Sequence, residues 1–206
     1  IPPPTSGVSL ANKVLAEGLK RENWKVSIIN SEYSRKITSN HGNISFEKFY
    51  FLKTYLSLYK VFFSRIVYIT IGQSFFGVLK YFPFLILSTV LRKKKVVHLH
   101  GGHLLNEYKQ LKGLKKNIFS YLLSQFDYGI VLSHSLRKNF EPFISSDKIF
   151  ELPNFFEQKL FVPKEQLMEK KNYKELRVLF LSNLIEEKGI NVLLEAEKQL
   201  RKKGIF

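Results

Sequence analysis

The stretch KVVHLHGG (residues 95–102) decides the fold, because it is typical of a buried strand that ends at a glycine turn. Its residues VVHL are nearly continuously apolar, as expected for a strand of a parallel sheet whose two faces are both covered. The stretch DYGIVLS (127–133) has the same character, and the intervening residues 111–126 have the period of a helix. Strands that alternate with helices at this spacing predict an α/β fold with a doubly wound, Rossmann-like parallel sheet.

The same alternation continues outward on both sides of these two strands. Thr5 or Ser6 can cap a first helix, since a hydroxyl oxygen accepts hydrogen bonds from the open N–H groups of a helix start. The other elements that the pattern predicts are, in order, a helix over 8–23, a strand over 24–30, a polar loop over 31–43, a helix over about 46–63, a strand over 66–71, a helix over 75–95, a short helix over 135–144 and a strand with a loop over 148–157.

We expect two domains of unequal completeness. Residues 1–165 form the first domain, the charged segment 166–176 is a linker, and residues 177–206 open a second Rossmann-like domain. The second contains one buried-type strand (LRVLFLSNL) and one amphipathic helix, which cannot enclose a core, so we expect it to be truncated. The first begins at a strand-to-helix loop, where an α/β domain normally has a central strand before it, so we expect its first strand to be missing.

Composition excludes several kinds of site. The chain has no cysteine, which excludes disulfides, thiolate zinc sites and a cysteine nucleophile. Its formal net charge is +16, which leaves three interpretations open: solvated lysines in a Lys-rich composition, an anionic membrane, or nucleic acid. Nucleic acid is the weakest of the three, because Tyr and Phe lie within apolar runs instead of alternating with Lys and Arg on one face.

Residues 66–91 are long and apolar enough to raise the question of a membrane span. They contain a single charge, at Lys80, but Gly72 and Pro83 interrupt them. We therefore expect a strand followed by a helix that is buried or touches a membrane, not a transmembrane segment. The run Lys93–Lys95, together with the aromatic stretch 46–63, suggests peripheral binding to an acidic lipid surface.

Five motifs follow one another in a characteristic order: PPPTSGVSLANKVLAEGL, HLHGGHL, YGIVLSHSLRKNF, ELPNFFE and RVLFLSNLIEEKGINVLLEA. In this order they resemble the family 4 retaining glycosyltransferases of the GT-B fold, over the whole of residues 1–206. The resemblance implies an acceptor-side Rossmann-like domain and the start of a nucleotide-sugar-binding domain. It also implies a metal-independent transferase, without a cofactor, that moves a sugar from a nucleotide-sugar to a glycan or lipid-linked acceptor in cell-envelope polysaccharide biosynthesis.

The lack of cysteine fits the cytoplasm, and the basic and aromatic segments fit a peripheral position at the inner face of the cell membrane. Because of the placement of the aromatic residues we expect no nucleic acid partner. We expect the 206-residue chain by itself to be inactive, because most of the donor site is not within it. A non-catalytic remnant or a membrane-surface binding module remains the alternative function.

The histidines that follow the central strand are the first candidate site. Alternation along the strand places His98 and His100 on one side, and Gly101 and Gly102 end the strand at the edge where α/β ligands bind. Three imidazoles raise the possibility of zinc, but no cysteine or suitably placed carboxylate completes a ligand set. The resemblance implies one catalytic histidine near the sugar: His100 as the first choice and His103 as the second.

The other candidate residues lie in loops that the resemblance assigns to the donor or to the cleft. Glycine at a helix start lets the backbone approach an anion, which suggests a donor-phosphate role for Gly7. The resemblance implies that Lys188 and Gly189 also contact the donor phosphates, whereas Asn183 stands where the family commonly has an arginine. Two further residues are expected to line the cleft, with a helix cap and a turn as their structural alternatives: Ser133 and Asn154.

Overall fold

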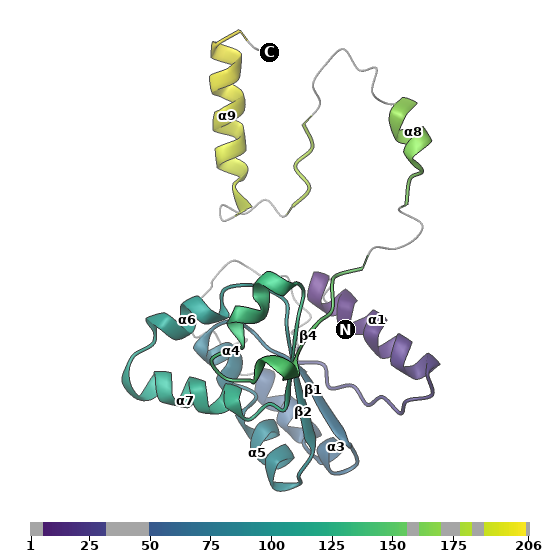
Figure 1. Ribbon diagram of the computed structural model, residues 1–206, viewed down its shortest axis with the longest axis vertical. Coiled ribbons are helices and arrows are strands. Elements are labelled where there is room, and N and C mark those ends of the chain that lie inside the picture. Colours follow the sequence, from purple (N-terminus) through teal and green to yellow (C-terminus); the bar gives the residue numbers. More distant parts are fainter. Residues whose placement is uncertain (1–5, 32–49, 156–160, 170–177, 183–187, 205–206) are drawn as a thin grey trace. The chain divides into compact units, whose positions relative to one another are not determined.

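The computed structural model describes residues 6–31, 50–155, 161–169, 178–182 and 188–204 of the chain (Figure 1). The chain divides into two compact units, and the first of them ends at Phe155. The first unit contains the sheet. None of the helices within the described ranges is long and apolar enough to cross a membrane.

The first unit is built on a parallel sheet. Its described strands are β1 (Ile66–Thr70), β2 (Lys94–Leu99), β3 (Tyr128–Val131) and β4 (Ile149–Glu151). They pair in the order β1-β2-β3-β4, and every pair is parallel, with Ile69 opposite Val97 and Val97 opposite Gly129. The predicted α/β class is therefore confirmed, and the sheet with its flanking helices is consistent with a doubly wound Rossmann-like fold.

Helices make the crossovers that parallel strands require. The segment between β1 and β2 holds α4 (Phe75–Leu79) and α5 (Phe82–Val90), and the segment between β2 and β3 holds α6 (Leu104–Gln110) and α7 (Gly113–Ser124). The remaining helices of this unit are α1 (Gly7–Arg21), α3 (Tyr59–Phe62) and the short 3-10 helices η1 (Tyr50–Ser57), η2 (His134–Asn139) and η3 (Ser146–Lys148).

The first helix begins at a reciprocal cap. Ser6 Oγ accepts from the backbone N–H of Ser9 at 3.1 Å, and Ser9 Oγ accepts from the N–H of Ser6 at 2.8 Å. Two N–H groups that a helix start leaves open are thereby satisfied. Of the two caps that the sequence allows, the structure has Ser6.

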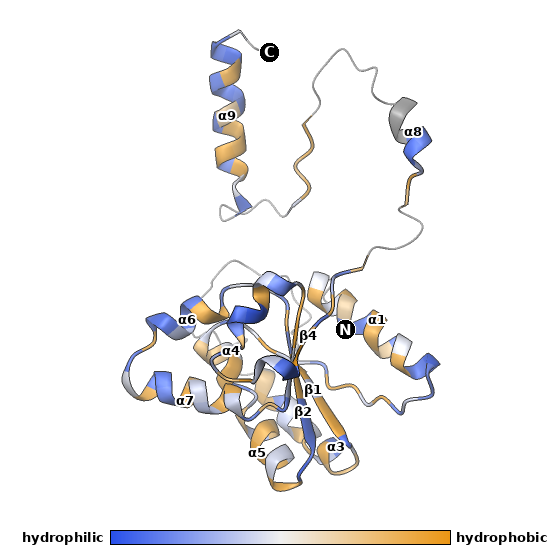
Figure 2. Ribbon diagram, in the orientation of Figure 1, coloured by the Kyte–Doolittle hydropathy of each residue, from blue (hydrophilic) through white to orange (hydrophobic). Residues whose placement is uncertain are grey.

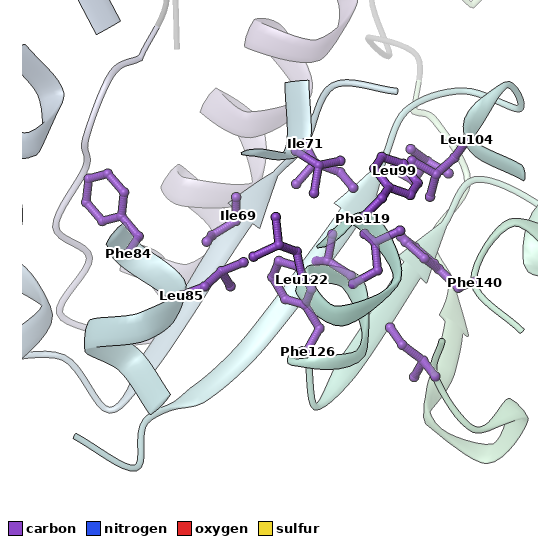
Figure 3. Packing of buried hydrophobic residues seen from close by; sticks show 14 of the residues in the cluster. Ile69, Ile71, Phe84, Leu85, Leu99, Leu104, Phe119, Leu122, Phe126 and Phe140 are labelled. Carbon is purple, nitrogen blue, oxygen red and sulfur yellow. The ribbon is translucent and has the colours of Figure 1, made fainter. Parts of the chain in front are cut away.

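The core lies between one face of the sheet and the helices of the crossovers (Figure 3). Val97 and Leu99 of β2 point into it and are fully buried. Phe119 of α7, also fully buried, stacks on Phe75 of α4 and on Tyr108 of α6. On β3, the lack of a side chain at Gly129 lets Phe140 pack directly against the strand, because a Cβ there would lie 2.8 Å from the Phe140 ring.

Two predicted strands are wrong. Residues 24–30 do not form a strand, because no described strand makes ladder hydrogen bonds with this segment. Its links are made by side chains instead, as where Lys60 Nζ donates to the carbonyl of Ile28. The described part of the second predicted strand, 178–182, is also not a strand, and Leu181 is 89% exposed. β-branched and apolar composition favours a strand only where a neighbour completes its hydrogen bonds.

Several helices differ from their predicted form. The single helix expected over 75–95 is two helices that meet before Pro83, which lies in the first turn of α5, where a missing N–H costs nothing. In the helix expected over 46–63, the described part is η1 followed by α3, and the short helix expected over 135–144 is a 3-10 turn, η2. The helix α6 was not predicted.

The second unit contains two described helices. The helix α8 (Lys164–Glu169) begins two residues before the expected linker (166–176) and continues into it. The helix α9 (Ile190–Lys202) confirms the amphipathic helix near the end of the chain. In α9, Arg201 Nη2 lies 2.6 Å from Glu197 Oε1 one turn earlier, a spacing that supports exposed helices.

Phe119→Ala should lower the free energy of unfolding of the first unit by about 3–5 kcal/mol, because it removes a fully buried ring and leaves a cavity between its stacked neighbours. Urea denaturation followed by circular dichroism measures this. The matched control is Tyr121→Ala on the exposed side of α7, which should change the same free energy by no more than about 0.5 kcal/mol. Equal losses of unfolding free energy in the two variants would contradict the assignment of the Phe119 face of α7 to the core.

Candidate functional site

The candidate site lies at the carboxyl edge of the sheet, where ligands of open α/β sheets bind. All four strands end at this edge because all are parallel. The segments that follow them there are residues 71–74 after β1, 100–103 after β2, 132–135 after β3 and 152–154 after β4. Sequence neighbours of four different strands are thus brought to one side of the first unit.

Gln73 joins the loop after β1 to the loop after β2. Its Oε1 accepts a hydrogen bond from the backbone N–H of His103 at 2.5 Å. A Cβ on Gly101 would lie 2.2 Å from Gln73 Nε2, so the amide can occupy this position only because residue 101 is glycine. A Cβ on Gly102 would lie 3.0 Å from Leu136 Cδ2, a less severe approach. The two glycines at this edge therefore have a packing role in the loop.

His98 and His100 form a pair beneath this edge, on the side of the sheet opposite the core. Their ring centroids are 4.0 Å apart, which confirms that the two side chains lie on the same side of the strand. The Tyr68 hydroxyl of β1 is hydrogen-bonded to His98 Nδ1. The Nε2 atoms of both histidines are buried, and neither has a hydrogen-bond partner among the described residues.

Burial keeps this pair uncharged at neutral pH. It lowers the pKa of His98 to about 4, with a smaller contribution from the neighbouring His100, and it also lowers the pKa of His100. Burial raises the pKa of Tyr68 to about 12, so the phenol keeps its proton. A neutral imidazole has one donor and one acceptor nitrogen, which suits a hydroxyl ligand better than an anion.

The helix α1 is anchored to the same side of the sheet. Thr70 Oγ1 donates to Asn12 Oδ1 at 3.0 Å, and Thr70 is the residue of β1 opposite His98 in β2. This contact brings the first half of α1 beside the histidine pair. Gly7 begins the helix and is exposed, and no described atom lies within 4 Å of the position that its Cβ would take. Packing of the described residues therefore does not require glycine there.

Three other predicted residues lie at the edge without joining the histidine pair. His103 is exposed at the start of α6, and its imidazole has no hydrogen bond or ring contact with the described residues. Ser133 holds the cap position of η2, but its hydroxyl caps no backbone N–H and lies 3.1 Å from the hydroxyl of Ser135. Asn154 is exposed beyond β4. The last backbone hydrogen bond before it among the described residues is donated by the N–H of Leu152 to the carbonyl of Val131.

Three of the four predicted donor residues, Lys188, Gly189 and Asn183, belong to the second unit, whereas Gly7 belongs to the first. Lys188 is exposed immediately before α9, and Gly189 holds the helix cap position with a left-handed φ of +80°. This conformation is natural for glycine and strained for other residues. Asn183 lies outside the described residues.

Sequence reasoning missed the residues that support the histidines. Tyr68 and Thr70 belong to the strand IVYIT, where the period of two places both on one face. Sequence could therefore have pointed to them once the histidine side of the sheet was identified. Gln73 and Glu107 had no such signal. Glu107 Oε1 accepts from the N–H of Phe75 at 2.8 Å, at the start of α4, a contact between residues 32 apart.

Comparisons of the chain with protein-family models, with curated proteins and with solved structures give no significant match. Within the described residues, no group of three or more His, Cys, Asp or Glu side chains could hold a metal ion.

The free energy of unfolding should fall as the pH is lowered from about 6.5 to about 4. In this window the unfolded chain binds a proton at His98 that the folded chain excludes, so acid favours unfolding. A difference of two to three pKa units corresponds to on the order of 3 kcal/mol. Urea denaturation at a series of pH values measures the slope.

His98→Gln is the informative variant, because its amide can bond to the Tyr68 hydroxyl and does not titrate. It should reduce the slope in this pH window, and the slope that remains is expected from His100, whose pKa burial also lowers. An unchanged slope in His98→Gln would show that another group carries the pH dependence.

Gly101→Ala should cost about 1 kcal/mol of stability, because the added methyl group displaces the Gln73 amide and breaks its bond to His103. A double-mutant cycle tests this cause. In a Gln73→Ala background the same substitution should cost nothing measurable, since the displaced group is already absent. Equal costs in the two backgrounds would place the strain elsewhere in the loop.

Proposed function

We propose that the chain belongs to a retaining glycosyltransferase, in which residues 1–165 are on the acceptor side and residues 177–206 are on the nucleotide-sugar side. The reaction moves a sugar from a nucleotide-sugar to a glycan or lipid-linked acceptor in cell-envelope polysaccharide biosynthesis. One observation carries the proposal: His100, a neutral imidazole at the carboxyl edge of a parallel sheet, has a buried Nε2 with no partner among the described residues. The order of the five sequence motifs supports it.

His100 is the proposed contact to the sugar. A buried polar atom without a partner costs about 1–3 kcal/mol, so a ligand that supplies the missing hydrogen bond is favoured. A sugar hydroxyl can donate to or accept from Nε2 in either tautomer of the imidazole. His98 behind it, held by Tyr68, limits the positions of the His100 ring and makes the contact directional.

The leaving group of this reaction is a nucleoside diphosphate, whose charge must be stabilised as the bond to the sugar breaks. Lys188 is the proposed cation, and the backbone N–H groups at the start of α9, which no side chain caps, are the proposed donors. For the first unit, the resemblance implies a donor-phosphate contact at Gly7, which begins α1. Asn183 in place of arginine leaves this phosphate site one cation short of the family pattern, and no metal cofactor enters the proposal.

Lys188→Ala should weaken binding of a nucleoside diphosphate about tenfold to a hundredfold, because losing a charge-assisted hydrogen bond costs roughly 1.5–3 kcal/mol. Calorimetric titration into the product of the whole reading frame measures the affinity. Lys202→Ala, which removes an exposed lysine at the other end of α9, is the matched control and should bind as the parent does. Asn183→Arg should strengthen binding if this position faces the phosphates.

His100→Ala should lower turnover with a smaller effect on nucleotide affinity, because its proposed partner is the sugar. Turnover is measured as release of nucleoside diphosphate from a panel of nucleotide-sugars. Unchanged affinity in Lys188→Ala would remove the donor assignment of that loop. A whole-frame product that neither binds nucleotide nor turns over any donor would favour the non-catalytic alternative.

A further inference from the structure

The amino edge of the sheet, opposite the candidate site, exposes large apolar side chains. Phe62 and Phe63 at the end of α3 are 54% and 87% exposed, and Val90 at the end of α5 is 72% exposed. Ile66, the first residue of β1, is 45% exposed at the same edge. Side chains of this size are normally shielded when they lie together, so a cluster of them suggests an interaction surface.

Two apolar stripes extend this cluster along the neighbouring helices. On α5, Phe82, Ile86 and Val90 recur every four residues and are all exposed, most strongly at Val90. Leu56 of η1, Tyr59 of α3 and Phe63 after α3 are also exposed, at spacings of three and four residues. Figure 2 shows the hydrophobic α5 beside the hydrophilic beginning of β2.

Hydrogen bonds fix the two loops of this edge to each other. Lys93 Nζ donates to the carbonyl of Phe62 at 3.0 Å, and the N–H of Lys94 donates to the carbonyl of Arg65 at 3.2 Å. The end of α5 is closed by a bond from the N–H of Lys93 to the carbonyl of Ser88 at 2.8 Å, with Arg92 in the left-handed region at φ +51°. The surface is therefore formed in advance and needs little ordering on binding.

The same edge is cationic. Arg65, Arg92 and Lys93 form no ion pair with any described residue. The carboxylate before β3, Asp127, lies 3.8 Å from Lys94 Nζ and 3.4 Å from Nζ of the buried Lys95. Lys95, which the sequence offered as part of a basic run, is thus committed to Asp127 and does not face solvent.

We propose that this amino-edge surface, made of Phe62, Phe63, Ile66, Val90, Arg65, Arg92 and Lys93, docks on an anionic lipid bilayer. Exposed Phe and Val side chains can enter the headgroup boundary while the cations beside them meet lipid phosphates. Phe62 and Phe63 can stack on bases, but the aliphatic Val90 and Ile66 beside them cannot, and this mixture favours lipid over a single strand. The inference holds whether or not the carboxyl edge transfers a sugar.

Co-sedimentation with vesicles of phosphatidylcholine, with and without phosphatidylglycerol, tests the proposal on the whole chain. Binding should require phosphatidylglycerol and should weaken as sodium chloride rises from about 0.1 M to about 0.5 M, because salt screens the attraction. Equal binding to the two kinds of vesicle would overturn the electrostatic part, and no binding to either would overturn the whole.

Arg92→Gly separates charge from folding. Glycine relieves the left-handed backbone at this position, so stability should be kept or raised while one cation is lost. Affinity for the anionic vesicles should fall about fivefold, the contribution expected of one cation near an acidic surface. Affinity equal to that of the parent would remove Arg92 from the surface.

The double variant Phe63→Ser with Val90→Ser removes the apolar part and should abolish most of the binding. Its matched control is Lys109→Ala with Leu114→Ser, which removes an exposed cation and an exposed leucine from α6 and α7 and should bind as the parent does. Light scattering on the free protein measures its oligomeric state and tests whether a second copy of the chain occupies this surface instead. If the parent is a dimer that Phe63→Ser with Val90→Ser makes monomeric, and neither binds vesicles, the surface joins two copies of the chain and the lipid proposal fails.

Discussion

The parallel ladder of β2 is the constraint on which the rest of the structure depends. β2 pairs with β1 on one side and with β3 on the other, and both pairings are parallel. A parallel neighbour can be reached only by crossing the sheet, so the chain must place helices between successive strands. The same constraint sends every strand to end at one edge, which is why loops that are far apart in sequence, at Gln73 and His103, come to share a hydrogen bond.

Alternation along β2 divides its two faces between different chemistries. Val97 and Leu99 enter a dry core, whereas His98 between them faces Tyr68 and His100. The imidazole of His98 is neutral in the folded chain, because burial lowers its pKa. Buried nitrogen atoms without partners are uncommon, and exceptions of this kind concentrate where a protein binds something.

Sequence reasoning succeeded where the local pattern was sufficient. The apolar runs of β2 and β3, the helical period of α7 and the shared side of His98 and His100 all follow from periodicity. It failed where pairing or packing decides: residues 24–30 have strand composition but no ladder partner. The contact of Gln73 with Gly101 could not be predicted either, because glycine in a sequence does not say which distant side chain takes the space of its missing Cβ.

The two edges of the sheet carry different chemistry and are held apart by the strands between them. Strands of four to six residues at about 3.3 Å per residue separate the edges by roughly 13–20 Å. A chain that docks through Phe63 and Arg92 therefore holds His100 at about that distance from the lipid phosphates. If both proposals hold, the acceptor hydroxyl lies well above the headgroups, which fits the growing end of a lipid-linked glycan better than the sugar next to its lipid.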